Sequence, residues 1–99
     1  MAYELRFAAA TKEHFNALTA PERATVFEAI ERQLLFEPLV ETRNRKPLRP
    51  NPIAPWELRI GDLRVFYEVE AGGEPVVRIL VIGKKIRNSL IVGGQELKL

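Results

Sequence analysis

Apolar and polar residues alternate most regularly between positions 56 and 67, which read W-E-L-R-I-G-D-L-R-V-F-Y. This alternation predicts two strands, at 56–60 and 63–67, joined by the two-residue turn Gly61-Asp62. Glycine at the first turn position suits a type II′ turn, which matches the twist of the strands. Side chains alternate between the two faces of a strand, so one face of the hairpin is apolar. That face carries Trp56, Leu58, Ile60, Leu63, Val65 and Tyr67.

The opposite face of this hairpin places two arginines side by side. The turn sets Arg59 directly across from Arg64, and like charges in such a cross-strand pair destabilise a sheet. Glu57 and Phe66 lie on the same face. Two neighbouring guanidinium groups can bind one phosphate through several hydrogen bonds. This face is therefore the predicted phosphate site; the alternative is a pair of surface arginines that point apart and are neutralised by Glu57 or Glu68.

The residues before the hairpin predict a strand and two helices. Residues 2–8 alternate apolar and polar side chains, as does a strand with one buried face. Thr11 offers an N-cap for a short helix, and Thr19 with Glu22 forms a capping box for a second helix. Pro38 is expected to end the second helix, because proline disfavours helical geometry in the residue before it. With almost no linker between them, the helices should form an antiparallel hairpin.

The residues after the hairpin predict the interior of a sheet. Residues 76–82 are apolar on both faces apart from Arg78, which is typical of a strand covered on both sides. We expect strand 63–70 to turn at 71–75 and pair with one edge of this strand. Residues 2–8 should then pair with its other edge, and both helices should lie on the face opposite the arginines.

We therefore expect a single domain, residues 1–99, of the α+β class with two layers. Its elements are an N-terminal strand, an antiparallel helix hairpin and a mostly antiparallel sheet of four to five strands in all. At most a short edge strand fits at 45–48, within a proline-rich connection. The tail, 88–99, is expected to be weakly structured, a partner-contact segment or a short extra strand.

Composition excludes several kinds of site. The chain has no cysteine, which excludes disulfides and thiolate metal sites, and its single histidine, His14, excludes a histidine-rich metal cluster. We expect His14 at the surface or at its boundary. No apolar run reaches the roughly 20 residues of a membrane span, and no signal-peptide pattern opens the chain. We therefore expect a cytoplasmic protein with no membrane partner, no metal and no other cofactor.

The net charge of +2 conceals an asymmetry. Residues 1–41 carry four basic and seven acidic side chains, a net charge of −3, and residues 42–99 carry eleven and six, a net charge of +5. Such a basic excess suggests an anionic partner, with nucleic acid as the first candidate, although a solvated surface is the simpler explanation. Nine of these eleven basic residues gather in the loop and sheet half: Arg43, Arg45, Lys46, Arg49, Arg59, Arg64, Lys84, Lys85 and Arg87.

Three motifs in this order resemble the RelE/ParE toxin superfamily. They are K-P-L at 46–48, W-E-L-R-I-G-D-L-R-V-F-Y-E-V at 56–69 and I-L-V-I-G-K-K at 79–85. The resemblance spans nearly the whole chain. The G-D-x-R-V-x-Y core is fairly specific when a strand ending in I-G and two basic residues follows it in so short a chain.

The resemblance implies the toxin of a type II toxin–antitoxin pair, with a cognate antitoxin as its partner. RelE-like toxins cleave mRNA in the ribosomal A site, without a metal, using the 2′-hydroxyl group as the nucleophile. ParE-like toxins share the fold and inhibit DNA gyrase. Neither activity implies a small-molecule ligand. The first expectation is thus an endoribonuclease that acts on mRNA at the ribosome and inhibits translation.

The resemblance also assigns candidate catalytic residues. Arg64 corresponds to the arginine of the G-x-x-R motif, Arg59 to a basic residue of the preceding strand, and Lys85 and Arg87 to the basic pair after the last strand. Cleavage needs groups that accept the 2′ proton, stabilise the charged phosphorane and protonate the leaving oxygen. Arg59 and Arg64 fit the second role, and Lys85 is a candidate acid or phosphate ligand.

Two positions depart from the pattern of RelE-like nucleases. Glu57 stands where a basic residue is common, and Ile91 stands near the position expected for a catalytic tyrosine. Glu57 is the one carboxylate of the predicted site, so it is either the base or an ion-pair partner of Arg59. These departures keep two alternatives open, a ParE-like gyrase inhibitor and a degenerate toxin that only binds its antitoxin.

The remaining candidates are expected to bind RNA or phosphate. Phe66 could stack on a base, as aromatic side chains do in single-strand binding, or it could lie beneath the tail residues 90–92. The other candidates are Lys46, Lys84 and Arg87.

Overall fold

The computed structural model describes residues 2–70 and 75–97. The predicted turn at 71–75 therefore lies outside the described residues except for Pro75. No helix in the described part of the chain is long and apolar enough to cross a membrane. The elements, in chain order, are β1 (Glu4–Phe7), α1 (Thr11–Asn16), α2 (Ala20–Leu34), β2 (Arg45–Pro47), β3 (Trp56–Ile60), β4 (Leu63–Glu70), β5 (Val76–Ile86), β6 (Ser89–Val92) and β7 (Gln95–Leu97).

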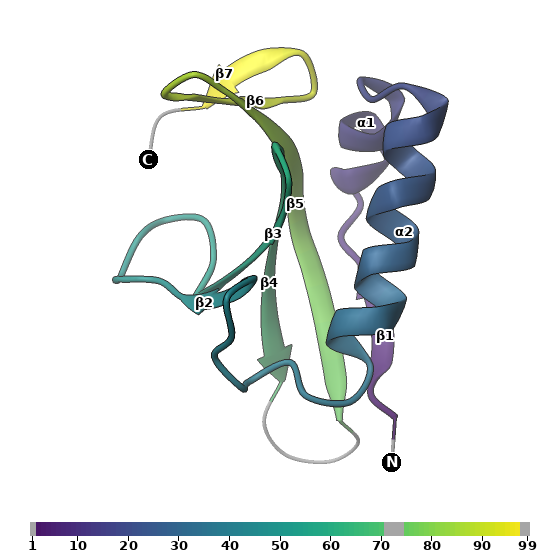
Figure 1. Cartoon of the computed structure of the whole chain (residues 1–99), viewed down its shortest axis with the longest axis vertical. Coiled ribbons are helices and arrows are strands. Elements are labelled where there is room, and N and C mark those ends of the chain that lie inside the picture. The colour runs from purple at the N-terminus through teal and green to yellow at the C-terminus, as the bar shows by residue number, and fades with distance from the viewer. Residues whose placement is uncertain (1, 71–74, 98–99) are drawn as a thin grey trace.

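All the described strands form one sheet, and both helices lie on the same side of it (Figure 1). The strand order is β2-β3-β4-β5-β6-β7, with β1 parallel to the first part of β5. The other pairs are antiparallel. The predicted two-layer α+β architecture and the central place of β5 are confirmed. The described sheet has seven strands rather than four to five, because the tail adds two.

The β3–β4 hairpin has the predicted register. Arg59 lies opposite Arg64, and Glu57 lies opposite Phe66. Gly61 has a φ of +58°, while the φ of Asp62 is not positive, as a type II′ turn requires. The apolar face packs against the helices. The core between the sheet and the helices comprises Leu18, Val26, Ile30, Leu34, Leu58, Leu63, Val65, Tyr67, Val77, Ile79 and Ile82.

Helix α2 begins as predicted and ends earlier than predicted. The Thr19 hydroxyl accepts from the Glu22 N–H at 3.2 Å, and the Glu22 carboxylate accepts from the Thr19 N–H at 2.9 Å, which completes the capping box. The helix stops at Leu34, three residues before Glu37. Beyond the helix, Pro38 is buried, and its carbonyl accepts a 2.6 Å hydrogen bond from the Tyr67 hydroxyl, which ties this connection to the sheet.

The prediction that Thr11 is an N-cap is wrong. Ala10 precedes the first residue of α1, and no side chain caps this helix. Thr11 is buried, and its hydroxyl donates to the Ala8 carbonyl at 2.7 Å. Threonine can satisfy a backbone carbonyl just as well as a backbone N–H, and here it ties the end of β1 to the start of the helix.

The tail is a β-hairpin rather than a weakly structured segment. Gly93 and Gly94 join β6 to β7 with φ values of +59° and +81°, the pattern of a type I′ turn. Strand β5 continues past Gly83 to Ile86 and pairs there with β6. A Cβ atom at Gly83 would lie 2.8 Å from the Ile91 carbonyl oxygen. Glycine at this position thus allows β6 to lie close against β5.

His14 completes one edge of β5. Strand β1 covers this edge up to Ile79, and β6 covers it from Lys84 onward. Between them, the Ile82 N–H donates to His14 Nδ1 at 3.2 Å. His14 is half-buried, at the boundary of the surface, and it satisfies a backbone donor that no described strand reaches.

This contact predicts a pH-dependent stability. Burial lowers the pKa of His14 below its ordinary value of 6.5, against a smaller opposing effect of Glu13. As pH falls through that value, the unfolded chain therefore binds a proton before the folded chain does, and the free energy of unfolding decreases. Urea unfolding of the wild type and of His14→Gln, from about pH 7.5 to about pH 5.5, checks this. The stability advantage of the wild type should shrink toward the acidic end; an advantage independent of pH would contradict it.

Candidate functional site

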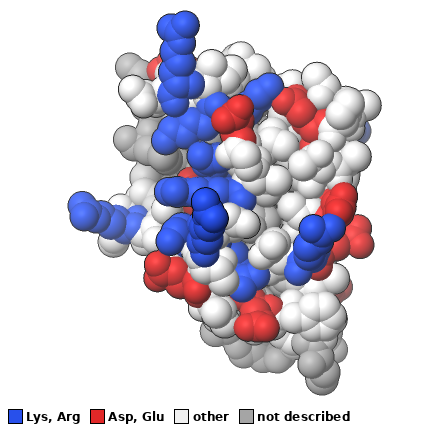
Figure 2. Space-filling view, in the orientation of Figure 1, with Lys and Arg blue, Asp and Glu red and all other residues white. Residues whose placement is uncertain are grey.

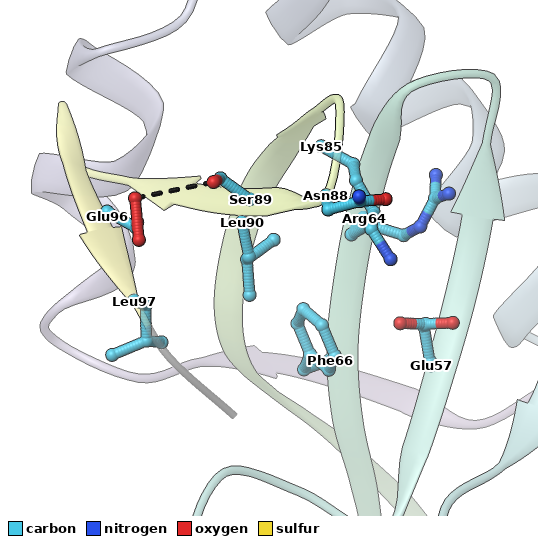
Figure 3. A pocket seen from close by; sticks show the side chains of 9 residues that line it. All are labelled: Glu57, Arg64, Phe66, Lys85, Asn88, Ser89, Leu90, Glu96 and Leu97. Atoms are coloured by element: carbon cyan, nitrogen blue, oxygen red, sulfur yellow. Dashed lines mark hydrogen bonds between the residues drawn. The ribbon is translucent and has the colours of Figure 1, made fainter.

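A pocket of about 410 Å³ lies on the sheet face opposite the helices. Strands β3, β4 and β5 supply one side of it, and the β6–β7 hairpin supplies the other (Figure 3). Four of the eight predicted site residues meet here. The lining residues are Glu57, Arg64, Phe66, Lys85, Asn88, Ser89, Leu90, Glu96 and Leu97.

Arg64 is held by its own turn. Its Nη1 donates to the carbonyl oxygens of Gly61 at 2.6 Å and Leu63 at 2.9 Å. Figure 3 shows Arg64 grouped with Lys85 and Asn88 at one end of the pocket. A guanidinium group has five N–H donors, and these two contacts use only one of its nitrogens. The rest of the fork makes no hydrogen bond to the described residues and can therefore bind an anion.

Glu57 explains how two arginines tolerate facing positions. Its side chain is only 10% exposed, and its Oε1 accepts from Arg59 Nε at 2.6 Å. This ion pair neutralises Arg59, while Arg64 turns to the backbone carbonyls. Arg59 lines a different hollow, beside α2, and does not line the pocket that contains Arg64. The two guanidinium groups therefore do not form the predicted twin receptor.

The basic residues at the end of β5 point to different places. Lys85 lines the pocket, whereas Lys84, its neighbour in the strand, points to the helix side and pairs with Glu22 at 2.5 Å. This hydrogen bond raises the pKa of Lys84 and lowers that of Glu22. Arg87 is exposed in the following turn, with a φ of +58°, and lies outside the pocket lining.

Two further candidates, Lys46 and Phe66, lie on the pocket face, but neighbouring side chains already engage both of them. Lys46 pairs in register with Glu57, and its Nζ lies 3.6 Å from a Glu41 carboxylate oxygen. Phe66 is 1% exposed and packs against Leu90. Of the two roles open to Phe66 from the sequence, the structure places it beneath the tail. A base could stack on it only after the tail hairpin had moved.

The tail supplies pocket residues that the sequence interpretation missed. Asn88 and Ser89 bring side-chain amide and hydroxyl groups, and Glu96 accepts from Ser89 Oγ at 3.3 Å (Figure 3). The sequence does contain a signal for this hairpin, because Gly93-Gly94 between apolar segments is typical of a two-residue turn. Ile91, near the expected tyrosine position, lines another hollow on the helix side.

Charge is distributed unevenly over the molecule. In Figure 2, lysine and arginine side chains gather on the sheet side, away from the helices. Arg45 does not belong to this surface, because it is buried and donates to the carbonyls of Val40 and Gln33 at 2.9 Å. Within residues 2–70 and 75–97, no group of three or more His, Asp or Glu side chains could hold a metal ion.

The fold resembles that of a protein of known structure. No model of a protein family matches the chain, and no curated protein matches its sequence. The structure is similar to a chain in the crystal structure of the toxin–antitoxin complex RelBE2 from Mycobacterium tuberculosis, with a TM-score of 0.72 and 27% sequence identity. The match covers 86% of this chain and all of the other. Together with the hairpin motif and the strand order, this likeness supports the resemblance of the chain to a RelE-like toxin.

Proposed function

We propose that this chain is the toxin of a type II toxin–antitoxin pair, an endoribonuclease that cleaves mRNA on the ribosome and inhibits translation. The observation that carries the proposal is the pocket in which Arg64 and Lys85 stand beside the carboxylate of Glu57. The likeness of the whole chain to a chain of a toxin–antitoxin complex supports the toxin role and a cognate antitoxin as partner. The proposed place of action is the cytoplasm.

The proposed reaction forms one P–O bond, breaks another and transfers two protons, one from the 2′-hydroxyl group to the base and one from the acid to the leaving 5′ oxygen. The 2′-hydroxyl oxygen attacks the adjacent phosphorus, giving a 2′,3′-cyclic phosphate and a free 5′-hydroxyl end. Arg64 stabilises the additional negative charge on the phosphorane. Glu57 Oε2 is not engaged by Arg59 in the structure and is the candidate acceptor of the 2′ proton. Lys85 binds the phosphate and is the candidate donor to the leaving 5′ oxygen. Each of these steps uses the chain's own residues, so the mechanism requires no metal.

A second candidate is a ParE-like toxin that inhibits DNA gyrase. Two observations favour it: Glu57 is already paired with Arg59, and no tyrosine or histidine is among the described residues that line the pocket. Such a toxin would use the basic face for binding alone. A degenerate toxin that only binds its antitoxin is the third candidate.

Induced expression without an antitoxin separates these functions. The endoribonuclease should stop growth and amino-acid incorporation within minutes, and primer extension should reveal new mRNA ends inside coding regions. Continued translation together with double-strand DNA breaks would overturn the proposal in favour of gyrase. Undisturbed growth at high expression would favour the degenerate toxin.

A further inference from the structure

The pocket on the sheet face has two chemically different ends (Figure 3). Arg64 and Lys85 supply cationic groups at one end, and Glu96 supplies a carboxylate at the other. The pocket volume of about 410 Å³ lies within the range of sites that hold small organic ligands. The proposed reaction uses the cationic end and Glu57, so it leaves the end beside Glu96 without a role.

Apolar side chains lie between these two ends (Figure 3). Phe66 and Leu90 are buried and pack together. Leu97 lines the same pocket and is 36% exposed. A flat nucleobase can cover apolar surface of this kind, as bases held between apolar side chains do. This part of the pocket therefore suits a base better than a second phosphate, which the carboxylate of Glu96 would repel.

The tail hairpin holds the carboxylate of Glu96 in place. The register of β6 with β7 sets Glu96 opposite Ile91, and its Oε1 accepts from Ser89 Oγ at 3.3 Å. Its Oε2 accepts no hydrogen bond from the described part of the chain. A carboxylate offers about four acceptor sites and no donor, so a single hydroxyl leaves most of them open. The edge of a ligand that meets this group must therefore carry donors.

Guanine is the base whose Watson–Crick edge offers two adjacent donors, N1–H and the N2 amino group. Adenine and cytosine each present one amino group beside a ring nitrogen that accepts, and uracil presents one N–H between two carbonyl oxygens. Proteins distinguish unpaired RNA bases by hydrogen bonds to this edge. Acceptors that face a carboxylate lose their hydrogen bonds to water without a replacement, which disfavours the other three bases.

We propose that Glu96 binds guanine in the nucleotide directly after the cut, with Ser89 as the residue that positions its carboxylate. This assignment rests on the proposed function, because the leaving 5′ oxygen belongs to that nucleotide and Lys85 is its candidate proton donor. With the 5′-phosphate at Arg64, the base extends over the apolar side chains toward Glu96. The upstream ribose then lies on the side of Glu57, away from the tail (Figure 3).

Codons that differ only in the nucleotide after the cut test this assignment. In single-turnover reactions on programmed ribosomes, the wild-type chain should cleave before guanine about tenfold or more faster than before the other bases. Glu96→Gln replaces an acceptor oxygen with an amide donor, so cleavage before guanine should slow about tenfold while the other three rates stay unchanged. A general loss of structure would slow all four reactions equally. Glu31→Gln removes the same charge from an exposed position of α2 and should keep the guanine preference.

Nucleotide binding tests the same site without cleavage. Guanosine 5′-monophosphate is titrated into the purified chain, and the amide chemical shifts of Ser89 and Leu97 report binding. It should bind about tenfold more tightly than the adenosine, cytidine and uridine monophosphates, and Glu96→Gln should remove this preference. Equal cleavage before all four bases, or equal binding of the four nucleotides, would reject the guanine site. Guanine-selective binding by a chain that cleaves no mRNA would keep this site and reject the endoribonuclease.

Discussion

Replacing Arg64 with alanine is expected to slow mRNA cleavage by about 10²–10³-fold, the usual effect of removing one donor that stabilises transition-state charge. Arg64 is the pocket cation that a fixed turn orients, because the Gly61 and Leu63 carbonyls hold one of its nitrogens. Its side chain is half-buried and makes no ion pair among the described residues. Its loss should therefore leave the fold intact.

Two matched variants make this result specific. Arg32→Ala removes the same charge from an exposed helix position, where Arg32 pairs with Glu28 one helical turn away, and should retain full cleavage. Arg64→Lys keeps the charge and loses the planar fork, so its rate should fall between those of the wild type and Arg64→Ala. Single-turnover cleavage of labelled mRNA measures all three. Equal losses in Arg32→Ala and Arg64→Ala would mean that only net charge matters.

Gly83→Ala is expected to destabilise the chain by about 1–3 kcal/mol and to disrupt the pocket as well. The new Cβ atom would lie 2.8 Å from the Ile91 carbonyl oxygen and 2.9 Å from Val92 Cγ2. Because the first of these is a backbone atom, strand β6 must move away from β5. Leu90 would then separate from Phe66, and the wall that carries Asn88 and Ser89 would shift.

A second glycine in the same hairpin distinguishes this clash from simple loss of glycine. Gly94 has a φ of +81°, and a Cβ atom added there would meet no described atom within 4 Å, so Gly94→Ala adds backbone strain without a clash. Both variants should lower the free energy of urea unfolding. Only Gly83→Ala should speed amide hydrogen exchange along the β5–β6 pair and reduce cleavage. Wild-type exchange rates along the β5–β6 pair and full activity in Gly83→Ala would contradict the close packing of β6.

The β3–β4 hairpin could be predicted in detail because its information is local. Twelve residues contain the turn glycine, the alternation and the motif, and a two-residue loop fixes the register. The same holds for the capping box of Thr19 and Glu22. The pairing of β1 with β5 is a long-range contact, and it could be predicted only because a strand apolar on both faces needs neighbours on both edges.

The rest of the site depends on where β5 ends. Ending this strand at Gly83 groups Lys84 with Lys85, but a strand that continues to Ile86 sends them to opposite faces. The tail hairpin follows from the same extension, since β6 needs residues 84–86 as its partner. A count of charges groups Arg45 with the surface cations. Its true partners are the carbonyls of Val40, in a loop, and Gln33, in a helix, and charge counting does not predict these contacts.

The pocket therefore joins two parts of the chain with different roles. The hairpin presents Glu57 and Arg64 on a rigid sheet, and the tail closes over Phe66 with side chains that can form hydrogen bonds. Cleavage of RNA in this pocket is the property on which the proposed function depends.

This cleavage is tested most directly in a reconstituted reaction. It contains the purified chain and programmed ribosomes that hold a defined codon in the A site. We expect one cut within that codon, leaving a 2′,3′-cyclic phosphate and a 5′-hydroxyl end, and the same cut about 10²–10³-fold more slowly with Arg64→Ala. Intact mRNA with the wild-type chain, under conditions in which the same preparation traps gyrase on cleaved DNA, would contradict it.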